Sequence, residues 1–304
     1  MSSTINTGSF SKALMPGVNA WYGDAYKEYP VEYTALFDTY SSRKAFEEDM
    51  GVSGLGLAQT FGEGQSINYD TMTQGFLTRY THVKYGLGFM ITREMVDDDQ
   101  YDVVGRQRAR ALAYSMRQTK ETVGANVYNR AFNSSYVGGD GVSMINTAHP
   151  NVMGGTQSNR PATDINVSEA ALEQAFIDIQ RFKNDRGLLI QVIPQSLIIP
   201  PELEFEVKRI LQSDGRVGTA NNDANILKGM GLFPKGVAVN HYLSSATAWF
   251  IRTNTPDGMK YFERMADTFA EDNDFDSDVA KFKAQGRYSF GWTDWRSVYG
   301  TPGV

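Results

Sequence analysis

Residues 91–132 read ITREMVDDDQYDVVGRQRARALAYSMRQTKETVGANVYNRAF, and this stretch organises the rest of the chain. It contains no proline and only two glycines, Gly105 and Gly124, among many strong helix formers. Acidic residues crowd its start and Arg130 lies near its end, which is the charge order that a helix dipole favours. The sequence therefore predicts a helix over residues 97–132. At a rise of about 1.5 Å per residue it would span roughly 54 Å, too long for the core of one compact domain.

The apolar stripe of this helix is thin, and Lys120 interrupts it. The stripe consists of Leu112, Met116, Val123, Val127 and Ala131. A helix with one narrow apolar side leaves its other sides to solvent or to another subunit. An ordinary surface helix explains this stretch alone about as well as a subunit contact does.

Composition limits the class of protein. The 304 residues are 41% hydrophobic and 21% charged, which predicts a globular core rather than disorder. No apolar run is long enough to cross a membrane, and the N-terminal residues lack the apolar core of a signal peptide, so we expect cytoplasmic synthesis. The absence of cysteine excludes disulfides and cysteine-based zinc sites. A net charge of -6 argues against a dedicated nucleic-acid binder.

The residues before the helix read as an arm followed by an extended hairpin. Glycines and prolines should break up any helix in residues 1–30, where Trp21, Tyr22 and Tyr26 offer aromatic anchors. A short helix is expected around residues 43–50. The glycine-rich residues 51–70 then lead to strand patterns over 74–91, with a bulge or twist near residue 81 where the apolar set changes face. A long two-stranded hairpin is marginal alone in water, so we expect this one to need support from elsewhere, for example from another copy of the chain.

The residues after the helix predict a separate α/β unit that begins near Asp164. Ser168 should cap a helix that ends by Gly187, and Pro200-Pro201 should open another. The expected strands are residues 188–193, 197–199, 235–242 and 246–253. An acidic loop over 271–278 and a strand over 280–292 complete the chain.

No catalytic, metal or cofactor constellation emerges from the motifs. The glycines of 54–64 lack the Gly-Lys-Ser/Thr of a phosphate loop. The acidic run that starts at Asp272 has Ser277 and Lys283 where an EF-hand requires glycine and glutamate. The three histidines lie in separate segments without metal-ligand spacing, and no nucleophile motif is present. We therefore expect no enzyme activity and no cofactor.

The order of the segments is more informative than any one of them. An arm and a glycine-rich hairpin precede ITREMVDDDQYD, the long helix and DGVSMINTAHP, and a unit containing NHYLSSATAWFIRTN follows. The chain closes on EDNDFDSDVAKFKAQGRYSFGWTDWRSVYG. This order resembles a major capsid protein of tailed double-stranded DNA bacteriophages, an α+β protein of the Hong Kong 97-type capsid fold, and the resemblance covers nearly the whole chain.

The resemblance implies a division of the chain into named parts. These are an N-terminal arm (1–42), an extended loop (43–86), a peripheral domain (87–163) with a spine helix (97–132), an axial domain (164–256) and a C-terminal return to the peripheral domain (257–304). Contacts between subunits are expected from the loop residues Phe61, Tyr69, Phe76, Arg79, Tyr80 and Lys84, and from the arm residues Trp21, Tyr22 and Tyr26.

The function implied by the resemblance is structural. Copies of the chain would assemble into hexamers and pentamers of an icosahedral head that encloses double-stranded DNA without binding it tightly. A separate scaffolding protein and a portal are expected partners, because no long helical scaffolding segment precedes the arm, and a mature chain should start at or near Met1. The lysine–asparagine pair that cross-links some members cannot be matched here. The alternatives are a nanocompartment shell of the same fold and a soluble α/β enzyme with an unrecognised site.

Overall fold

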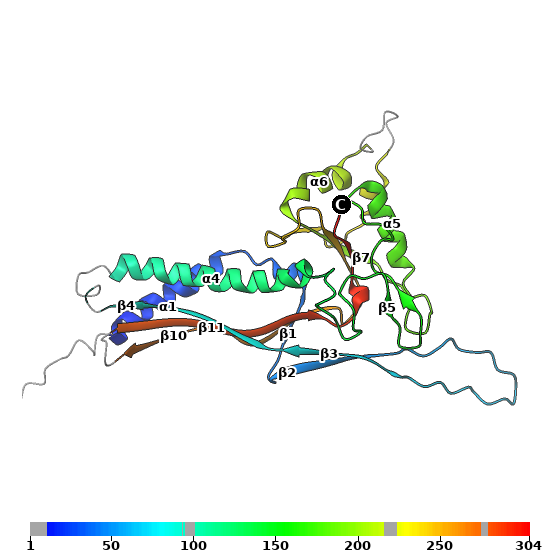
Figure 1. Ribbon diagram of the computed structural model, residues 1–304, viewed down its shortest axis with the longest axis horizontal. Coiled ribbons are helices and arrows are strands. Elements are labelled where there is room, and N and C mark those ends of the chain that lie inside the picture. The colour runs from blue at the N-terminus through cyan, green and yellow to red at the C-terminus, as the bar shows by residue number, and fades with distance from the viewer. Residues whose placement is uncertain (1–10, 93, 95–100, 216–223, 275–278) are drawn as a thin grey trace, which may run out of the picture.

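The computed structural model describes residues 11–92, 94, 101–215, 224–274 and 279–304. Figure 1 shows an elongated molecule with three parts. A long helix lies along a sheet of long strands to form the peripheral unit. A more compact axial unit rises above one end of that layer, and a narrow hairpin projects past it.

The peripheral unit is a four-stranded sheet with the long helix along one face. The helix is α4 (Tyr101–Asn129), and the sheet has the order β1-β10-β11-β4. The strands are β1 (Asp38–Ser41), β10 (Met259–Asp274), β11 (Val279–Trp292) and β4 (Val83–Ile91). β1 runs parallel to β10 and the other pairs are antiparallel. The prediction of a long helix is confirmed over the residues of α4; residues 97–100 lie outside the described residues, and residues 130–132 form a turn.

The arm contains a helix, so the prediction that glycine and proline would break up residues 1–30 is wrong. α1 (Ser11–Glu28) includes Pro16, Gly17 and Gly23, and the short α2 (Tyr33–Leu36) follows it. Interior glycine costs about 1 kcal/mol and proline about 3 kcal/mol relative to alanine. Packing offsets that cost, because side chains near the C-terminal end of α1 are buried in one cluster with α4, β4 and β11.

The hairpin consists of two paired strands and a long connection. β2 (Phe46–Val52) pairs with β3 (Gln74–Thr81) in antiparallel register, and the connecting residues 53–73 contain no helix or strand. The predicted helix around residues 43–50 is therefore wrong, because backbone pairing with β3 outweighs local helix propensity there. The expected bulge near residue 81 is a change of sheet: the chain leaves the hairpin at Thr81 and enters the peripheral sheet at Val83.

The axial unit is a second four-stranded sheet, ordered β12-β9-β7-β8, with helices beside it. Its strands are β7 (Pro194–Ile199), β8 (Val237–Val239), β9 (Trp249–Thr253) and β12 (Val298–Thr301). Its helices are α5 (Glu169–Gln180), η2 (Pro201–Leu203), α6 (Glu204–Gln212), α7 (Ile226–Met230) and η3 (Trp295–Ser297). A small pair, β5 (His149–Pro150) with β6 (Thr156–Gln157), lies below the unit.

Predictions for the axial unit are partly confirmed. Ser168 caps α5 by accepting a hydrogen bond from the Ala171 N–H at 3.2 Å, and the helix opened by two prolines is present as η2 and α6. The strand expected over 188–193 is wrong: those residues form a loop, and the strand starts at Pro194, a first position that tolerates proline. The first helix ends at Gln180 rather than near Gly187.

The C-terminal residues contribute strands to both units. β10 and β11 join the peripheral sheet, as expected for residues 257–304, but β12 pairs with β9 in the axial sheet. The acidic loop expected over 271–278 is part of β10 as far as Asp274, and residues 275–278 lie outside the described residues. Because β12, at the end of the chain, is an edge strand of the axial sheet, the axial unit is not formed from one continuous segment.

Candidate subunit interface

The projecting hairpin exposes large apolar side chains to solvent. Figure 1 shows it reaching beyond the axial unit, away from the end of the sheet where β10 finishes and β11 begins. In the connection, Tyr69 is 91% exposed. The other exposed apolar side chains of the connection are Leu55, Leu57, Phe61, Ile67 and Met72. Exposed apolar side chains in such number make the connection a candidate interaction site.

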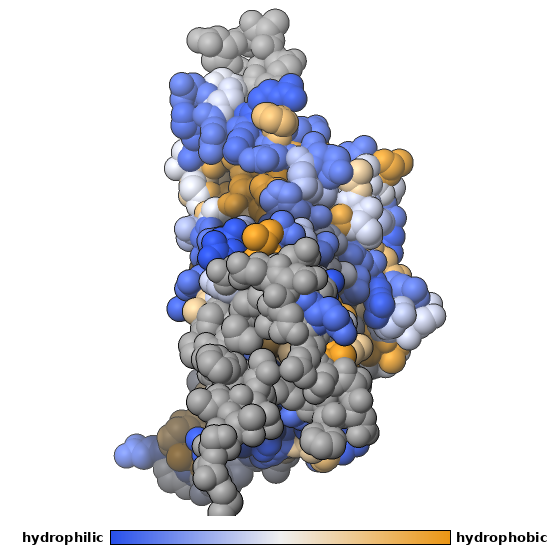
Figure 2. Space-filling model, turned by 90° about the vertical axis from the view of Figure 1, so that its left-hand side faces the viewer, coloured by the Kyte–Doolittle hydropathy of each residue, from blue (hydrophilic) through white to orange (hydrophobic). Residues whose placement is uncertain are grey.

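Figure 2 views the molecule along its long axis from the end opposite to the hairpin, and the surface above the grey atoms shows hydrophobic residues in patches among hydrophilic ones. The exposed apolar residues of the hairpin connection lie at the other end of the subunit, where the hairpin projects.

A network of charged and hydroxyl groups fixes the base of the hairpin to the peripheral sheet. The ammonium group of Lys260 is buried between Asp49 of β2 and the Asp257 carboxylate, which lies 2.9 Å away. The Thr293 hydroxyl donates to Asp49 Oδ2 at 2.7 Å and lies 2.7 Å from the hydroxyl of Tyr80. Burial alone would lower the pKa of Lys260, but hydrogen bonds and attraction from the two aspartates outweigh it and raise that pKa. The lysine is therefore held in its charged form.

A second contact holds the beginning of the connection to the axial unit. Arg186 Nη1 lies 2.7 Å from Asp70 Oδ2, and the same oxygen accepts the Gly56 N–H at 2.8 Å. Hydrogen bonds from the N–H groups of Gly56 and Thr71, together with Arg186, lower the pKa of Asp70. These contacts attach the connection, near both of its ends, to the loop after α5. The apolar side chains between Gly56 and Asp70 stay exposed.

His82 lies at the junction between the hairpin and the peripheral sheet. Its ring nitrogens are 2.9 Å from the Ser289 hydroxyl and 3.1 Å from the Ser42 hydroxyl, and the residue is buried. Burial and the nearby Arg287 lower the pKa of His82, which favours the neutral ring. The sequence offered no metal-ligand spacing for this histidine, and its surroundings explain it as a junction residue.

The predicted loop contacts occupy three different surroundings. Phe61 and Tyr69 are exposed on the connection, and Phe76 and Arg79 are exposed to a lesser degree on β3, where Arg79 stacks on the Phe46 ring at 3.7 Å. Tyr80 is only 3% exposed and packs against its own peripheral sheet. Lys84 is exposed on β4 rather than on the hairpin. The contact of these residues with a neighbouring subunit stays a prediction.

The predicted arm contacts lie against their own subunit. Tyr22 is 5% exposed and stacks on Phe269 of β10, with ring centroids 5.0 Å apart. The Tyr26 hydroxyl donates to Asp267, and the Trp21 ring lies beneath the Arg106 guanidinium at 5.0 Å. These three residues attach α1 to α4 and β10, and their contact with a neighbour stays a prediction.

The charged residue that interrupts the stripe of α4 has a structural role that sequence reasoning missed. Lys120 Nζ lies 2.8 Å from Asp267 Oδ2, and each of the two side chains is only 3% exposed. One residue along, Glu121 accepts the Tyr33 N–H at 2.8 Å and the Glu32 N–H at 3.1 Å, so it caps α2. The interruption of an apolar stripe by a lysine was the available signal, and its acidic partner lies 147 positions away in sequence.

A second buried polar cluster joins the peripheral and axial units. The side-chain amide of Asn159 donates to the carbonyls of Met144, Trp295 and Val298 at 2.8, 3.2 and 2.9 Å. His149 has no exposed surface, lies 2.6 Å from Asp140 Oδ2, and stacks on the Trp295 ring at 4.6 Å. His149 is therefore part of a packed junction between the two units.

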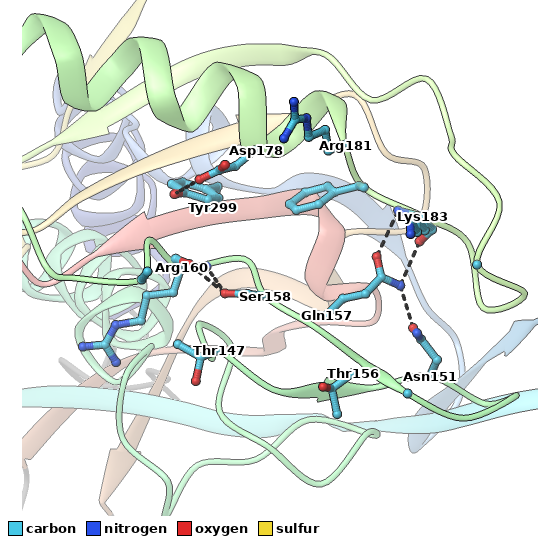
Figure 3. Close-up of a pocket in the computed structure, with 14 residues that line it drawn as sticks. Thr147, Asn151, Thr156, Gln157, Ser158, Arg160, Asp178, Arg181, Lys183 and Tyr299 are labelled. Atoms are coloured by element: carbon cyan, nitrogen blue, oxygen red, sulfur yellow. Dashed lines mark hydrogen bonds between the residues drawn. The ribbon is translucent and has the colours of Figure 1, made fainter.

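A pocket of about 630 Å³ lies between β6, the end of α5 and β12. Figure 3 shows that polar side chains at its wall are engaged with one another. Gln157 accepts the Lys183 N–H at 2.9 Å and donates to Asn151 Oδ1 at 2.7 Å, while the Tyr299 hydroxyl donates to Asp178 at 2.9 Å. Burial and the adjacent Asp178 raise the pKa of Tyr299. The bonds of Gln157 attach the β5–β6 pair to the axial unit. None of the bonds named here joins a nucleophile to a general base.

Two further kinds of feature are absent from the described residues. No three or more histidine, aspartate or glutamate side chains of that part of the chain are grouped so as to hold a metal ion. No helix within it combines the length and the apolar character needed to cross a membrane.

Comparison with known proteins assigns a family. Residues 76–300 match the family model described as phage capsid protein. Among solved structures, the procapsid of bacteriophage JBD30 aligns with a TM-score of 0.55 at 14% identity, covering 97% of this chain and 76% of that chain. The capsid of a native GTA particle aligns with a TM-score of 0.54 at 9% identity, covering 88% of each chain. No curated protein matches the chain.

A third solved structure represents another kind of particle. The virus-like particle from Pyrococcus furiosus aligns with a TM-score of 0.52 at 12% identity, covering 93% of this chain and 97% of that chain. At identities this low, the three structures establish a shared fold, and the family model adds the family.

Proposed function

This chain belongs to the phage capsid protein family and is a major capsid shell protein, and we propose that its copies form the hexamers and pentamers of an icosahedral phage head. The observation that carries the proposal is the match over residues 76–300, in a chain whose hairpin connection leaves its large apolar side chains exposed. Assembly buries such surfaces on neighbours, as obligate interfaces do. The role is structural, and we propose that the chain is not an enzyme.

We propose that those of the predicted residues that are exposed form the contact between subunits. Phe61 and Tyr69 have most of their surface free, and Phe76, Arg79 and Lys84 keep enough to contact a neighbour. Tyr80, Trp21, Tyr22 and Tyr26 would act from within the subunit, by holding the hairpin base and α1 in place. Each apolar Å² buried on a neighbour would contribute about 25 cal/mol.

The partners are proposed from the role of a shell. Double-stranded DNA would be enclosed rather than bound, because a chain of net charge -6 neutralises few phosphates. A separate scaffolding protein would direct assembly in the host cytoplasm, a portal would occupy one vertex, and the virion would contain the mature shell. A nanocompartment shell is the second candidate, supported by the likeness to the Pyrococcus furiosus particle.

Electron microscopy of the expressed protein tests the proposal. Closed shells, or rings of six and five subunits, are the expected products, and sedimentation velocity should show species far heavier than the 33.8 kDa chain. DNA inside particles recovered from infected cells indicates a phage head, whereas an enclosed enzyme indicates a compartment. A protein that remains monomeric at high concentration, with and without a scaffolding partner, would overturn the proposal.

A further inference from the structure

The buried cluster around Asn159 fixes which atoms of its side chain donate and accept hydrogen bonds. The amide nitrogen points at three backbone carbonyls, at 2.8, 3.2 and 2.9 Å. The amide oxygen accepts the Asn146 N–H at 2.9 Å. Exchanging the two atoms would set oxygen against three carbonyls and nitrogen against an N–H group, so the hydrogen bonds determine the orientation of this amide.

This orientation leaves both ring nitrogens of His149 facing acceptors. Nε2 lies 3.0 Å from the amide oxygen of Asn159, and Nδ1 lies 2.6 Å from Asp140 Oδ2. An amide oxygen only accepts, so Nε2 must carry a proton. The other oxygen of Asp140 accepts the Val142 N–H at 3.3 Å, as an ionised carboxylate does. Nδ1 then carries a proton as well, which makes the ring a cation.

His82 provides a comparison within the same subunit. It is also buried, but its ring nitrogens contact the hydroxyls of Ser289 and Ser42, at 2.9 and 3.1 Å. A hydroxyl can either donate or accept, so these partners suit a neutral ring with one protonated nitrogen. The two buried histidines are therefore expected to differ in charge at neutral pH.

The aromatic partner of His149 favours a positive ring. Trp295 stacks on it with ring centroids 4.6 Å apart and planes 10° apart. A cation over the face of an indole is attracted by the negative charge of that face, and the attraction is stronger where solvent is excluded. His149 has no exposed surface, so this contact acts at close to its full strength.

The carboxylates near His149 show the same pattern of charge. A cavity of about 350 Å³ beside Asp140 is lined by aspartates of the described residues, namely Asp49, Asp140, Asp185, Asp257 and Asp294. Arg296 pairs with Asp185 at 2.9 Å and with Asp294 at 3.2 Å. Lys260 pairs with Asp49 and with Asp257. Asp140 is the fifth aspartate, and His149 stands where the other four have a basic partner.

The cluster joins segments that belong to different units. Asp140 lies in the loop after α4 of the peripheral unit, and His149 begins β5. The carbonyls that face the Asn159 amide include those of Trp295 and Val298, where the chain passes from β11 of the peripheral sheet to β12 of the axial sheet. The charge of His149 therefore acts at the crossing point between the two units.

We propose that His149 is a buried imidazolium whose second proton holds the peripheral and axial units together as a pH-dependent clamp. Loss of that proton leaves the Nδ1 lone pair facing a carboxylate oxygen 2.6 Å away, and the two repel. The folded subunit therefore keeps the proton to a higher pH than an unfolded chain, in which histidine is half-protonated near about pH 6.5. The stabilisation is complete below that pH and is lost as the pH rises and the folded ring deprotonates.

Nitrogen NMR of subunits with labelled histidine tests the protonation directly. The chain has three histidines, so single substitutions assign every ring signal. At about pH 7.5 both ring nitrogens of His149 should have the shifts of protonated nitrogens, whereas His82 should show one protonated and one unprotonated nitrogen. Asp140→Asn removes the carboxylate and should make the His149 ring neutral at this pH. A neutral His149 in the wild type would overturn the proposal.

Equilibrium unfolding measures the clamp. The ratio of the unfolding constants of His149→Gln and wild type should fall at least about tenfold between about pH 6.5 and 9, because keeping a proton for one further pH unit corresponds to that factor. The ratio is needed because burial raises the pKa of Asp294, which adds a pH dependence of the same sign to both proteins. The lowered pKa of His82 places its effect below this range.

His241→Gln is the matched control. His241 lies 2.6 Å from Glu32 but is largely exposed, so solvent screens the pair and the corresponding ratio should change less than about threefold. A ratio for His149→Gln that stays constant with pH would contradict the clamp. If this variant does not fold, the NMR comparison of wild type with Asp140→Asn decides. All measurements use unassembled subunits, so their outcome is independent of whether shells form.

Discussion

The axial sheet and the projecting hairpin use similar apolar side chains in opposite surroundings. Every residue of β9 is buried, and Trp249 has no exposed surface. In β2 the residues alternate between exposed and half-buried, and the connection beyond exposes all its large apolar side chains. The difference indicates that one region stabilises the subunit and the other is available to a second subunit.

The physical basis is the number of partners that each strand has. β9 lies between β7 and β12 and is covered by the core cluster of the axial helices. β2 and β3 form a two-stranded sheet, which has no second layer of its own and is marginal in water. Substitutions should therefore separate stability from assembly, and four predictions test how complete that separation is.

The largest expected effect on stability comes from the axial core. Trp249→Ala should lower the free energy of unfolding by about 3–5 kcal/mol, because it leaves a cavity and removes the indole donor to the Ile165 carbonyl. Tyr69→Ala, the matched aromatic change in the connection, should stay within about 0.5 kcal/mol. Chemical denaturation of unassembled subunits measures both, and equal losses would break the comparison.

A slightly smaller effect is expected from the buried ion pair beneath α4. Lys120→Met should cost about 3 kcal/mol, because Asp267 would remain buried without its cationic partner. The double variant Lys120→Met/Asp267→Leu should recover much of that loss, since it removes both charges. Lys208→Met, which breaks the exposed pair with Glu204, is the control and should cost less than about 0.5 kcal/mol. A double variant no more stable than the single one would contradict the ion-pair account.

The junction at His82 should add a modest dependence on pH. Its pKa is lowered in the folded state, so the stabilisation is complete above the unfolded value of about 6.5 and is lost as pH falls through the folded value. Stability should therefore decrease in acid more in the wild type than in His82→Gln. Unfolding curves of both proteins at several pH values below neutrality measure the difference, and parallel pH profiles would exclude a role for His82.

The smallest effect on stability and the greatest on assembly should come from the connection. Replacing residues 53–73 by a short Gly-Ser turn should leave thermal unfolding of the subunit nearly unchanged, because few of those side chains are buried. Shell formation should be lost, and hydrogen exchange across this stretch should be fast in free subunits and slow in assembled ones. Normal assembly of the shortened chain, or its unfolding, would show that the two regions are not independent.

Whether an element could be predicted depends on how far apart in sequence the residues that decide it lie. The region of α4, the Ser168 cap and the strands β9 and β11 could be predicted because periodicity and capping are local. α1 and β2 could not, since each is decided by packing or pairing with residues distant in sequence. The same limit applies to Lys120, whose partner Asp267 has no sequence signal of its own.

The sequence by itself determined the order of the segments, the long helix, the acidic net charge and the lack of cysteine, and that order was sufficient to identify the family. Only the tertiary structure decided which apolar residues are buried: Tyr22 and Tyr80 pack inside the subunit, whereas Phe61 and Tyr69 remain outside it. Composition cannot distinguish these two pairs, because the burial of an aromatic side chain depends on which distant strand or helix lies beside it. The place of β4 at the end of the peripheral sheet was likewise visible only once the strand order was known.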